Sequence, residues 1–349
     1  MRKVTVNASL TYDIIIEKGI LDRAGEESAR ALKPCRAAIL TDSNVAPLYL
    51  ERLEKSLISS GFSPISFTVR AGEESKNAEN LLKFLNFLAE NRITRSDCIF
   101  TLGGGVVGDM GGFAASIYLR GIRFIQIPTT LLAMVDSSVG GKTAIDLPAG
   151  KNLVGAFYQP SLVLCDYDTL STLPEAIFAD GCAEVIKYGI INDRPLFDKL
   201  KAPIMPQIEE IIEGCVKNKR NIVDADERDV GVRQLLNLGH TAAHAIENLS
   251  GFEISHGSAV AIGIAIVSRS AATMGHISEG ELSEIIELLK QYSLPTECPY
   301  SAKEIAEIAL SDKKRSGGKI NLILPFGIGN SQIYEIDVET LESFFSKGL

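Results

Sequence analysis

Four polar side chains recur at helical spacing in one otherwise apolar stretch of the chain. Arg233, Asn237, His240 and His244 are separated by intervals of four, three and four residues, and most residues between them are Leu, Ala or Gly. On a helix of 3.6 residues per turn, this spacing forms one stripe. Burying such a stripe is costly unless each group binds a partner, a metal ion or a ligand. The stripe therefore predicts a functional site on a mostly buried helix.

Three of the four histidines, His240, His244 and His256, fall close together in the sequence. Two histidines four residues apart on one helix face suit a divalent cation, and Zn²⁺ accepts imidazole and carboxylate ligands together. Glu184 is the candidate carboxylate, because it lies in an apolar helical stretch where a charge needs a partner. Lys187 would lie on the same face as Glu184. Each histidine alone could be a satisfied core residue, but the cluster favours a metal site.

A glycine-rich segment, Gly103–Asp109, follows an apolar stretch that is typical of a strand. Small residues there would let backbone N–H groups approach a pyrophosphate at a helix N-terminus. Asp42 ends another expected strand, where its carboxylate could accept a ribose hydroxyl or cap a helix. The glycine spacing is not Gly-x-Gly-x-x-Gly, so a tight turn with close packing remains the alternative.

A second loop resembles a phosphate loop only superficially. Asp136 stands where the first glycine of that motif would be, so a P-loop NTPase is disfavoured. Lys142, with Lys151 and Asn152 nearby, could still supply donors to an anion. The alternative is a set of solvated surface lysines.

Basic residues accompany these motifs although the net charge is −9. Together they indicate a pocket for a multiply charged anion, such as a phosphate plus a carboxylate, although a surface role is the usual alternative for each. They are Arg120, Lys142, Lys151, Lys187, Lys219, Arg233, Lys313 and Lys314. The negative net charge argues against nucleic acid or an anionic membrane as a partner.

The elements that must position these residues divide the chain into two halves. Strands expected near residues 3–8, 12–17, 36–40, 65–69, 98–102 and 161–165 alternate with helices, which is typical of an open parallel sheet. Helices are then expected near residues 174–190, 204–224, 231–250, 256–275, 279–293 and 301–312, with strands only at 319–324 and 332–336. We therefore expect an α/β protein: a Rossmann-like nucleotide-binding α/β domain over residues 1–165, followed by a mostly α-helical metal-binding domain over residues 166–349.

Composition indicates a soluble globular enzyme, with 46% hydrophobic and 23% charged residues. No apolar run is long enough to span a bilayer, and Met1–Asn7 lacks the apolar core of a secretory signal. The six cysteines include no Cys-x-x-Cys pair, so neither a disulfide framework nor a zinc ribbon is indicated. A cytoplasmic location is the simplest expectation.

Five longer segments resemble the 3-dehydroquinate synthase family of sugar phosphate cyclases, in the expected order and over nearly the whole chain. They are residues 103–110, 126–143, 150–157, 183–189 and 237–245. The resemblance implies a phosphate lyase of the shikimate pathway, which serves aromatic amino acid biosynthesis. Its substrate would be the small anionic sugar phosphate 3-deoxy-D-arabino-heptulosonate 7-phosphate, and its products 3-dehydroquinate and phosphate. The implied cofactors are NAD and a divalent metal, Zn or Co, and the implied assembly is a homodimer.

The implied chemistry begins with transient oxidation of a ring hydroxyl by NAD. Phosphate elimination, re-reduction and an intramolecular aldol closure follow, so the net redox change is zero. The metal would hold the hydroxyl being oxidised and stabilise developing negative charge.

The resemblance also assigns roles to individual residues. The metal ligands would be Glu184, His240 and His256, which turns His244 from a ligand into a proton-transfer residue. Other residues credited with catalysis are Asp136, Lys142, Lys187, Lys219, Asp229 and Asn237. Substrate would be bound by Arg120, Asp136, Lys142, Asn152, Lys187, Lys219, Arg233, Asn237 and one of Lys313 and Lys314. The cofactor would be held by Asp42, Asn44, Glu73, Lys76, Gly104, Gly105, Val106, Asp109, Thr129, Thr130, Lys142, Lys151, Thr169 and Thr172.

One position departs from the family pattern. Asp229 stands where the family commonly has Glu, at a position credited with proton transfer, and its side chain is one methylene shorter. A general base needs hydrogen-bond contact with the group that it deprotonates, directly or through one water. The question is therefore whether the shorter Asp229 side chain reaches that group. We expect activity to be kept.

Three other functions compete with this one. Related sugar phosphate cyclases act on different phosphorylated ketoses, but Asn152, Arg233, Asn237 and the Lys313–Lys314 pair favour the dehydroquinate reaction. A metal-dependent polyol or glycerol-phosphate dehydrogenase would have similar nucleotide and metal sites but would catalyse a net hydride transfer. A non-catalytic anion sensor would not need His244 beside a metal and a hydride carrier.

Overall fold

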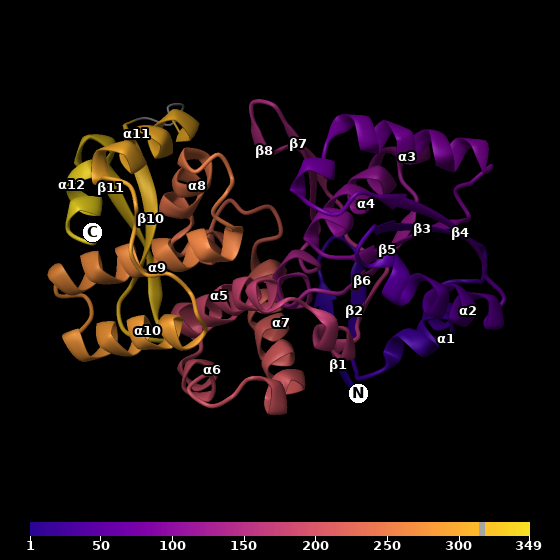
Figure 1. Cartoon of the computed structure of the whole chain (residues 1–349), viewed down its shortest axis with the longest axis horizontal. Helices are drawn as coiled ribbons and strands as arrows, with labels where there is room; N and C mark the ends of the chain where they lie inside the picture. The colour runs from indigo at the N-terminus through magenta and orange to yellow at the C-terminus, as the bar shows by residue number, and fades with distance from the viewer. Residues whose placement is uncertain (314–317) are drawn as a thin grey trace. The chain divides into compact units, whose positions relative to one another are not determined.

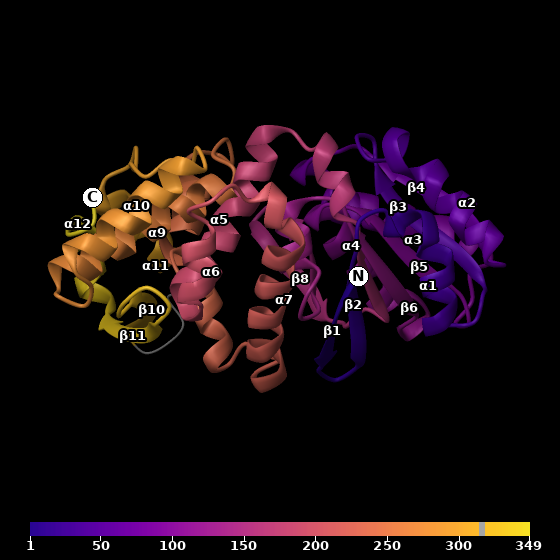
Figure 2. The ribbon, with the colours of Figure 1, turned by 90° about the horizontal axis from the view of Figure 1, so that it is seen from below.

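The computed structural model describes residues 1–313 and 318–349, and it divides into two compact units. The first unit is Met1–Leu173 with Ile208–Arg228, and the second is Pro174–Gln207 with Asp229–Leu349. This division differs from the boundary expected after residue 165, because helix α7 (Ile208–Ala225) packs against strand β1 (Arg2–Asn7) (Figure 2). Arg2 donates to Glu213 at 2.6 Å, and the Asn7 amide donates to Asp224 at 2.9 Å.

In the described chain, the first unit holds a seven-stranded sheet with the order β1-β2-β9-β6-β5-β3-β4 (Figure 1). After β1, its strands are β2 (Thr11–Ile16), β3 (Arg36–Asp42), β4 (Ser63–Val69), β5 (Cys98–Gly103), β6 (Arg123–Pro128) and β9 (Leu162–Cys165). All neighbouring pairs are parallel except β1 with β2, which confirms the predicted parallel α/β fold. Strand β6 was not among the expected strands.

Helices cover both faces of this sheet. They are α1 (Ala24–Ala31), α2 (Glu51–Ser59), α3 (Ala78–Glu90) and α4 (Gly105–Ile117). Alternate strand residues enter two separate cores: Ile39 and Phe100 pack in the core with α1 and α2, whereas Leu40 and Ile99 pack in the core with α3 and α4. Figure 1 shows these two helix pairs on opposite faces. Burial on both faces explains the nearly continuous apolar runs of the central strands.

The strand order creates a topological switch point between β3 and β5. The chain leaves β3 toward β4 on one side and returns to β5 and β6 on the other. Thr41 pairs with Leu102, so the neighbouring strands β3 and β5 finish at Asp42 and Gly103, at the same carboxyl end of the sheet. In open α/β sheets, ligands bind outside the carboxyl ends of the strands at such a point.

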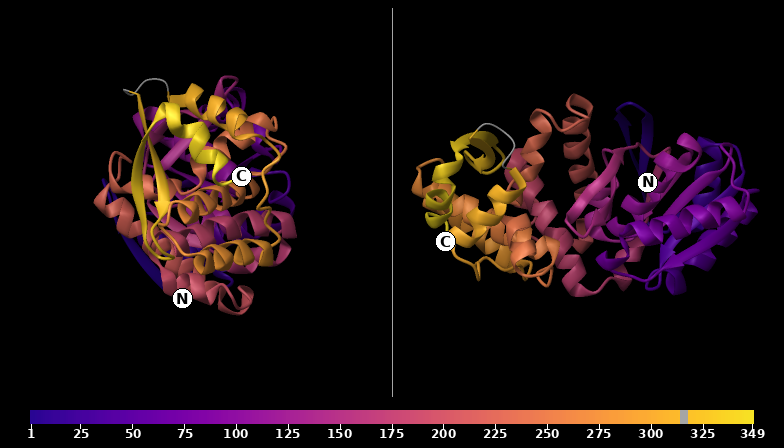
Figure 3. Two further views of the ribbon diagram at one scale, coloured as in Figure 1. Left: turned by 90° about the vertical axis from the view of Figure 1, so that its left-hand side faces the viewer. Right: turned by 90° about the horizontal axis from the view of Figure 1, so that it is seen from above.

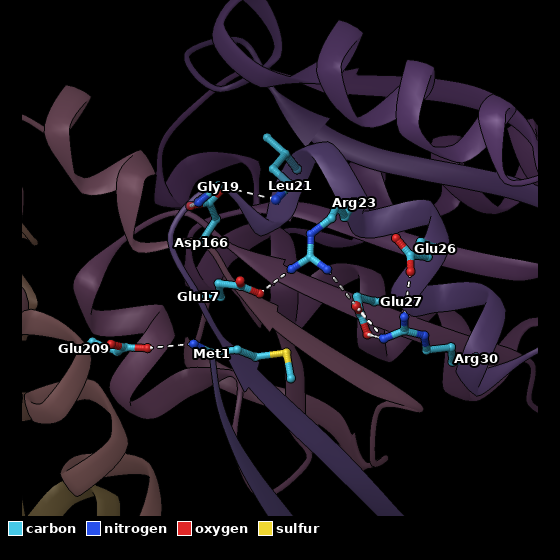
Figure 4. A network of polar contacts seen from close by, with 10 residues as sticks. All are labelled: Met1, Glu17, Gly19, Leu21, Arg23, Glu26, Glu27, Arg30, Asp166 and Glu209. Carbon is cyan, nitrogen blue, oxygen red and sulfur yellow. Dashed lines mark hydrogen bonds and ion pairs between the residues drawn. The ribbon is translucent and has the colours of Figure 1, made fainter.

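Asp166 fixes the segment that follows β9. Its buried carboxylate accepts the Gly19 amide at 2.7 Å and the Leu21 amide at 3.0 Å (Figure 4). It thereby ties the start of the 3₁₀ helix η1 (Ile20–Arg23) to the 3₁₀ helix η6 (Tyr167–Thr172), which carries two predicted cofactor residues.

A two-stranded hairpin, β7 (Lys142–Leu147) and β8 (Gly150–Phe157), also belongs to the first unit and was not predicted. Its strands pair antiparallel, with Lys142 opposite Phe157. A side chain at Gly155 would clash with the Thr143 carbonyl, so the two strands can approach this closely only with glycine there.

The second unit is mostly helical, as expected. Its helices are α5 (Glu175–Asn192), α6 (Arg194–Lys199), α8 (His240–Leu249), α9 (His256–Thr273), α10 (Glu279–Gln291), α11 (Ala302–Lys313) and α12 (Leu341–Ser346). Helix α9 is apolar almost all round and packs against α5, α8, α10 and α12. Strands β10 (Lys319–Pro325) and β11 (Ser331–Asp337) form a long antiparallel hairpin (Figure 3). Within the described residues, we find no helix with the length and apolarity that a membrane span requires.

The prediction of one helix over residues 231–250 is wrong. A 3₁₀ helix, η8 (Val232–Asn237), ends at Leu238, and α8 begins only at His240. Gly239 between them has a φ of 77°, and an added Cβ would lie 2.6 Å from the Ile264 amide nitrogen. The break therefore follows from the close packing of Gly239 against α9, and the polar stripe is shared between two helices.

Candidate active site

Three side chains of the second unit converge as a metal-binding group. Glu184, His240 and His256 each offer a ligand atom, and these atoms lie within 4.8 Å of one another. Glu184 Oε1 is 3.2 Å from His256 Nε2 and 3.5 Å from His240 Nε2. Two imidazole nitrogens and one carboxylate form a donor set that is typical of catalytic zinc sites. The residues therefore fit the divalent metal that the sequence predicts.

Close helix packing beside each histidine ligand sets this geometry. His240 and His256 are the first residues of α8 and α9, and each adjoins a glycine in backbone contact with a neighbouring helix. A Cβ at Gly257 would clash with the backbone of Asp180 on α5. Asp180 Oδ1 also accepts the Ser258 amide at 3.1 Å. Asp180 lies one helical turn before Glu184, so these contacts align the two helices that carry Glu184 and His256.

The electrostatics favour an ionised carboxylate at Glu184. Burial acts to raise the pKa of Glu184, but the ion pair with Lys187 and hydrogen bonds from His240 and His256 hold it well below its usual value. For His256, burial acts to lower the pKa, but hydrogen bonds with Glu184 and Glu247 raise it to about 10. A metal ion must therefore displace a proton from His256 when it binds.

A cavity of about 470 Å³ adjoins the metal-binding group. Asn237, His240, Thr241 and His244 line it, and the His240 and His244 rings lie 5.6 Å apart between centroids. His244 is outside the metal-binding group but faces the same cavity, as a proton-transfer residue would need to. The remaining lining residues are Gln234, Lys319, Ile320, Asn321, Ile323 and Glu335.

Residues of the β10–β11 hairpin are the site residues that sequence reasoning missed. Asn321 Nδ2 donates to Gln234 Oε1 at 3.0 Å, and Lys319 pairs with Glu335 at 2.5 Å. Lys319 and Asn321 lie two residues apart and therefore share one strand face. That alternation was visible in the sequence, but nothing in it indicated that the polar face borders a cavity.

Of the other predicted site residues in the second unit, the structure describes the side chains of some and not of others. Arg233 and Lys187 are each 1% exposed, so both cations are buried. The side chain of Lys313, the last residue of α11, is not among those described, and Lys314 lies outside the described residues.

In the first unit, the N-terminus of α4 provides an anion-binding arrangement at the switch point. Gly104 caps the helix, Gly105 begins it, and no described side chain caps its first amides. The nearby Thr129 hydroxyl is buried, and within the described part of the chain it has no hydrogen-bond partner. Free amides at a helix N-terminus and an unmatched hydroxyl suit a pyrophosphate group. These residues therefore fit the predicted dinucleotide.

Lys76 contacts one residue predicted to bind the cofactor and one predicted to bind the substrate. Its ammonium lies 2.6 Å from Asp109 Oδ2 and 2.6 Å from Asn152 Oδ1. Burial acts to lower the pKa of Lys76, but Asp109 and Glu73 outweigh this and raise it, so the lysine stays charged. The Asn152 amide donates to Asp146 Oδ1 at 2.7 Å, and the Asp146 amide donates to the Lys76 carbonyl at 2.8 Å, so the hairpin is joined to the Lys76 segment.

Other predicted cofactor residues already have structural partners. Asp42 Oδ1 accepts the amides of Asn44 at 2.8 Å and Val45 at 3.0 Å, which closes a turn. The helical turn η2 (Ala46–Leu50) that follows has Val45 as its N-cap and no side-chain cap, so Asp42 is not the helix cap expected as the alternative. Thr169 donates its hydroxyl to the Asp166 carbonyl at 2.8 Å, and the Thr172 hydroxyl is hydrogen-bonded to Tyr49. The cofactor roles of these residues stay predictions.

Asp136 and Lys219, two of the predicted substrate residues, come together in the first unit. Lys219 donates to the Asp136 carbonyl at 2.7 Å and forms an ion pair with its carboxylate. Lys142 is exposed at the start of β7. Arg120 ends the 3₁₀ helix η4 (Tyr118–Arg120), which follows α4. Its substrate role stays a prediction.

Comparisons with known proteins cover both units. The family models described as "3-dehydroquinate synthase N-terminal" and "3-dehydroquinate synthase C-terminal" match residues 66–180 and 181–315. A 3-dehydroquinate synthase of Clostridium beijerinckii is 46% identical, over 96% of this chain and 97% of that protein.

Solved structures of related cyclases have the same fold. The 2-epi-5-epi-valiolone synthase of Streptomyces hygroscopicus subsp. jinggangensis 5008, with NAD+ and Zn²⁺ bound, is 26% identical with a TM-score of 0.88, over 99% of this chain and 98% of that one. A 2-deoxy-scyllo-inosose synthase, complexed with carbaglucose-6-phosphate, NAD+ and Co²⁺, is 23% identical with a TM-score of 0.88 over the full length of both chains. At that identity the second likeness shows the fold alone.

Proposed function

This chain belongs to the 3-dehydroquinate synthase family, and we propose that it performs the family's reaction with bound NAD+ and a divalent metal ion. The enzyme converts 3-deoxy-D-arabino-heptulosonate 7-phosphate into 3-dehydroquinate and phosphate. The observation that carries the proposal is the Glu184, His240 and His256 group beside the cavity lined by Asn237 and His244.

The bound groups would supply a reversible hydride acceptor and a Lewis acid. Glu184, His240 and His256 would hold the metal. In the first unit, the α4 amides, Thr129 and Lys76 would hold the nucleotide.

Lys187 and Arg233, both buried in the second unit, would bind anionic groups of the substrate. Asn237 would orient a substrate hydroxyl in the cavity. His244 would hold and move the proton, since it borders the cavity without being a ligand. Asp229 would be a second proton-transfer residue.

One assay tests the reaction class. The heptulosonate phosphate is supplied with Zn²⁺ and a catalytic amount of NAD+, while phosphate, dehydroquinate and NADH are followed together. We expect equal amounts of phosphate and dehydroquinate with no net NADH. Stoichiometric NADH would instead indicate a dehydrogenase, and inactivity with this substrate but turnover of another phosphorylated ketose would indicate a different cyclase.

The family also supports a homodimer in the cytoplasm. Sedimentation of the purified chain would test the dimer, which predicts a particle of twice the 37.7 kDa chain mass.

A further inference from the structure

We infer that Glu247 is a positioning residue for the metal ligand His256, and that its carboxylate supplies negative charge that the site needs to hold a dication. This inference rests on the proposed metal-dependent function. It concerns a residue outside the three ligands, on the same helix as His240.

Glu247 contacts the His256 ring at the nitrogen opposite to the one that faces Glu184. It lies seven residues after His240 on α8, two helical turns along the same face. Its side chain is 3% exposed, and its Oε2 lies 3.6 Å from His256 Nδ1, which is an ion-pair separation. The other ring nitrogen, Nε2, faces Glu184 at 3.2 Å. His256 is therefore held between two carboxylates, one at each ring nitrogen.

This placement determines which ring nitrogen can bind a metal. A neutral imidazole carries its single proton on one nitrogen, and the partner of that nitrogen selects the tautomer. A carboxylate at Nδ1 favours the Nδ1–H form, which leaves the Nε2 lone pair for the ion. His240 has an analogous partner, because its Nδ1 lies 3.1 Å from the Leu238 carbonyl oxygen. The two ligands thus differ in that His256 has a charged partner and His240 a neutral one.

The charge balance of the site gives Glu247 a second effect. Glu184 and Lys187 form a buried ion pair, and each side chain is 1% exposed. The Lys187 charge would therefore offset part of the attraction of Glu184 for a dication. Glu247 is a second buried carboxylate that contacts a ligand, His256, at 3.6 Å. Its charge would reach the metal through the His256 ring.

A purely structural role makes a different prediction. A buried carboxylate is costly unless it is paired, so Glu247 could serve only to stabilise the fold around α8. In that case, its replacement would lower the stability of the metal-free protein and leave metal affinity unchanged. Metal affinity therefore separates the two roles.

The experiment compares Zn²⁺ affinity of the full-length protein and three variants by competition with a chromophoric chelator. Glu247→Gln removes the charge with little change in shape, and Glu247→Asp keeps the charge. Glu253→Gln is the matched control, because Glu253 is exposed and lies three residues before His256. Affinities are compared at about pH 7 to 9, so that proton competition for Nε2 is measured with them.

We expect Glu247→Gln to weaken Zn²⁺ binding by about 10- to 100-fold. Glu247→Asp should recover part of this loss, and Glu253→Gln should bind like the wild type. Equal affinity of the Glu247→Gln protein and the wild type would overturn the inference while leaving the metal proposal intact. If the wild type itself bound no metal, the proposed function would fail as well.

Imidazole ¹⁵N spectra of the zinc-loaded wild type give a readout that does not depend on any variant folding. We expect His256 to be protonated at Nδ1 and metal-bound at Nε2. Zinc bound at Nδ1 would overturn the inference.

Discussion

The buried Lys76 ammonium and the partly buried Asp109 carboxylate form an ion pair at 2.6 Å, near the start of α4. The pair joins the segment after β4 to the helix that follows β5, on either side of the switch point. The amide oxygen of Asn152 completes the contacts of the lysine. The three residues thus form one polar cluster that a dinucleotide would meet at the strand ends.

Replacing Lys76 with Met should weaken NAD+ binding about 10- to 100-fold, because a hydrogen bond to a charged group contributes roughly 1.5–3 kcal/mol. Isothermal titration calorimetry with NAD+ measures this, and it suits a chain without Trp. Lys83→Met is the control, since Lys83 is exposed on α3 and pairs only locally with Glu79. Unchanged NAD+ affinity of the Lys76→Met protein would argue against the cofactor site.

Variants of His244 and His240 should distinguish a role in proton transfer from a role in metal binding. His244 lines the cavity but is absent from the metal-binding group. We expect His244→Gln to lower kcat by about 10²- to 10⁴-fold while Zn²⁺ affinity stays at the wild-type value. His240→Gln should lose Zn²⁺ affinity as well as activity. Loss of zinc binding in the His244→Gln protein would return His244 to the ligand set.

Asp229 has a backbone conformation that suits its side chain. Its φ is 59°, in the left-handed region where Asp and Asn are enriched among residues other than glycine. We expect Asp229→Asn to keep the fold but to lower kcat at least tenfold, because the amide cannot accept a proton. Activity and melting temperature, measured on the same preparation, check both parts.

A second variant, Asp229→Glu, tests whether the length of the side chain limits activity. If the left-handed backbone explains the shorter side chain, the longer one should lower the melting temperature without raising kcat. A gain in kcat would show that reach limits the natural enzyme.

Gly257→Ala should disrupt the metal-binding group without touching a ligand. The added Cβ would clash with the Asp180 backbone and push α9 away from α5, which separates His256 from Glu184. We expect Zn²⁺ binding to fall more than tenfold and the melting temperature to fall with it. Gly280→Ala is the matched control, because a Cβ there has only Ser278 nearby on α10, at 3.9 Å, and should be neutral or slightly stabilising. Wild-type zinc affinity in the Gly257→Ala protein would contradict the packing argument.

The sequence allowed prediction of the elements whose patterns are local. The apolar runs that became β3 and β5 were recognisable because both faces of a central parallel strand are buried. The β7–β8 hairpin was missed because its strands mix Gly, Ala, Lys, Asp and Asn with the apolar residues, and residues of these types are depleted in strands. The break at Gly239 was missed because a single glycine is tolerated in a helical pattern, and only the packing of α9 requires it.

The candidate site could be predicted only in part for a similar reason. Resemblance identified the Glu184, His240 and His256 group that the structure brings together. Glu247 lies three residues after the last residue of the polar stripe, His244, but its contact with His256 depends on how α8 packs against α9. The cavity residues Lys319 and Asn321 come from a hairpin whose neighbours no sequence spacing specifies. Long-range packing, which a local pattern does not encode, accounts for each of these omissions.

The chain passes from one unit to the other three times, after Leu173, Gln207 and Arg228. A single proteolytic cut therefore cannot release either unit as an intact fragment. Truncation after Leu173 would strip α7 from β1 and leave Arg2 and Asn7 without their carboxylate partners. For protein engineering, the nucleotide-binding unit is thus not a portable module: grafting it into another protein requires a designed closure that returns α7 to the sheet edge.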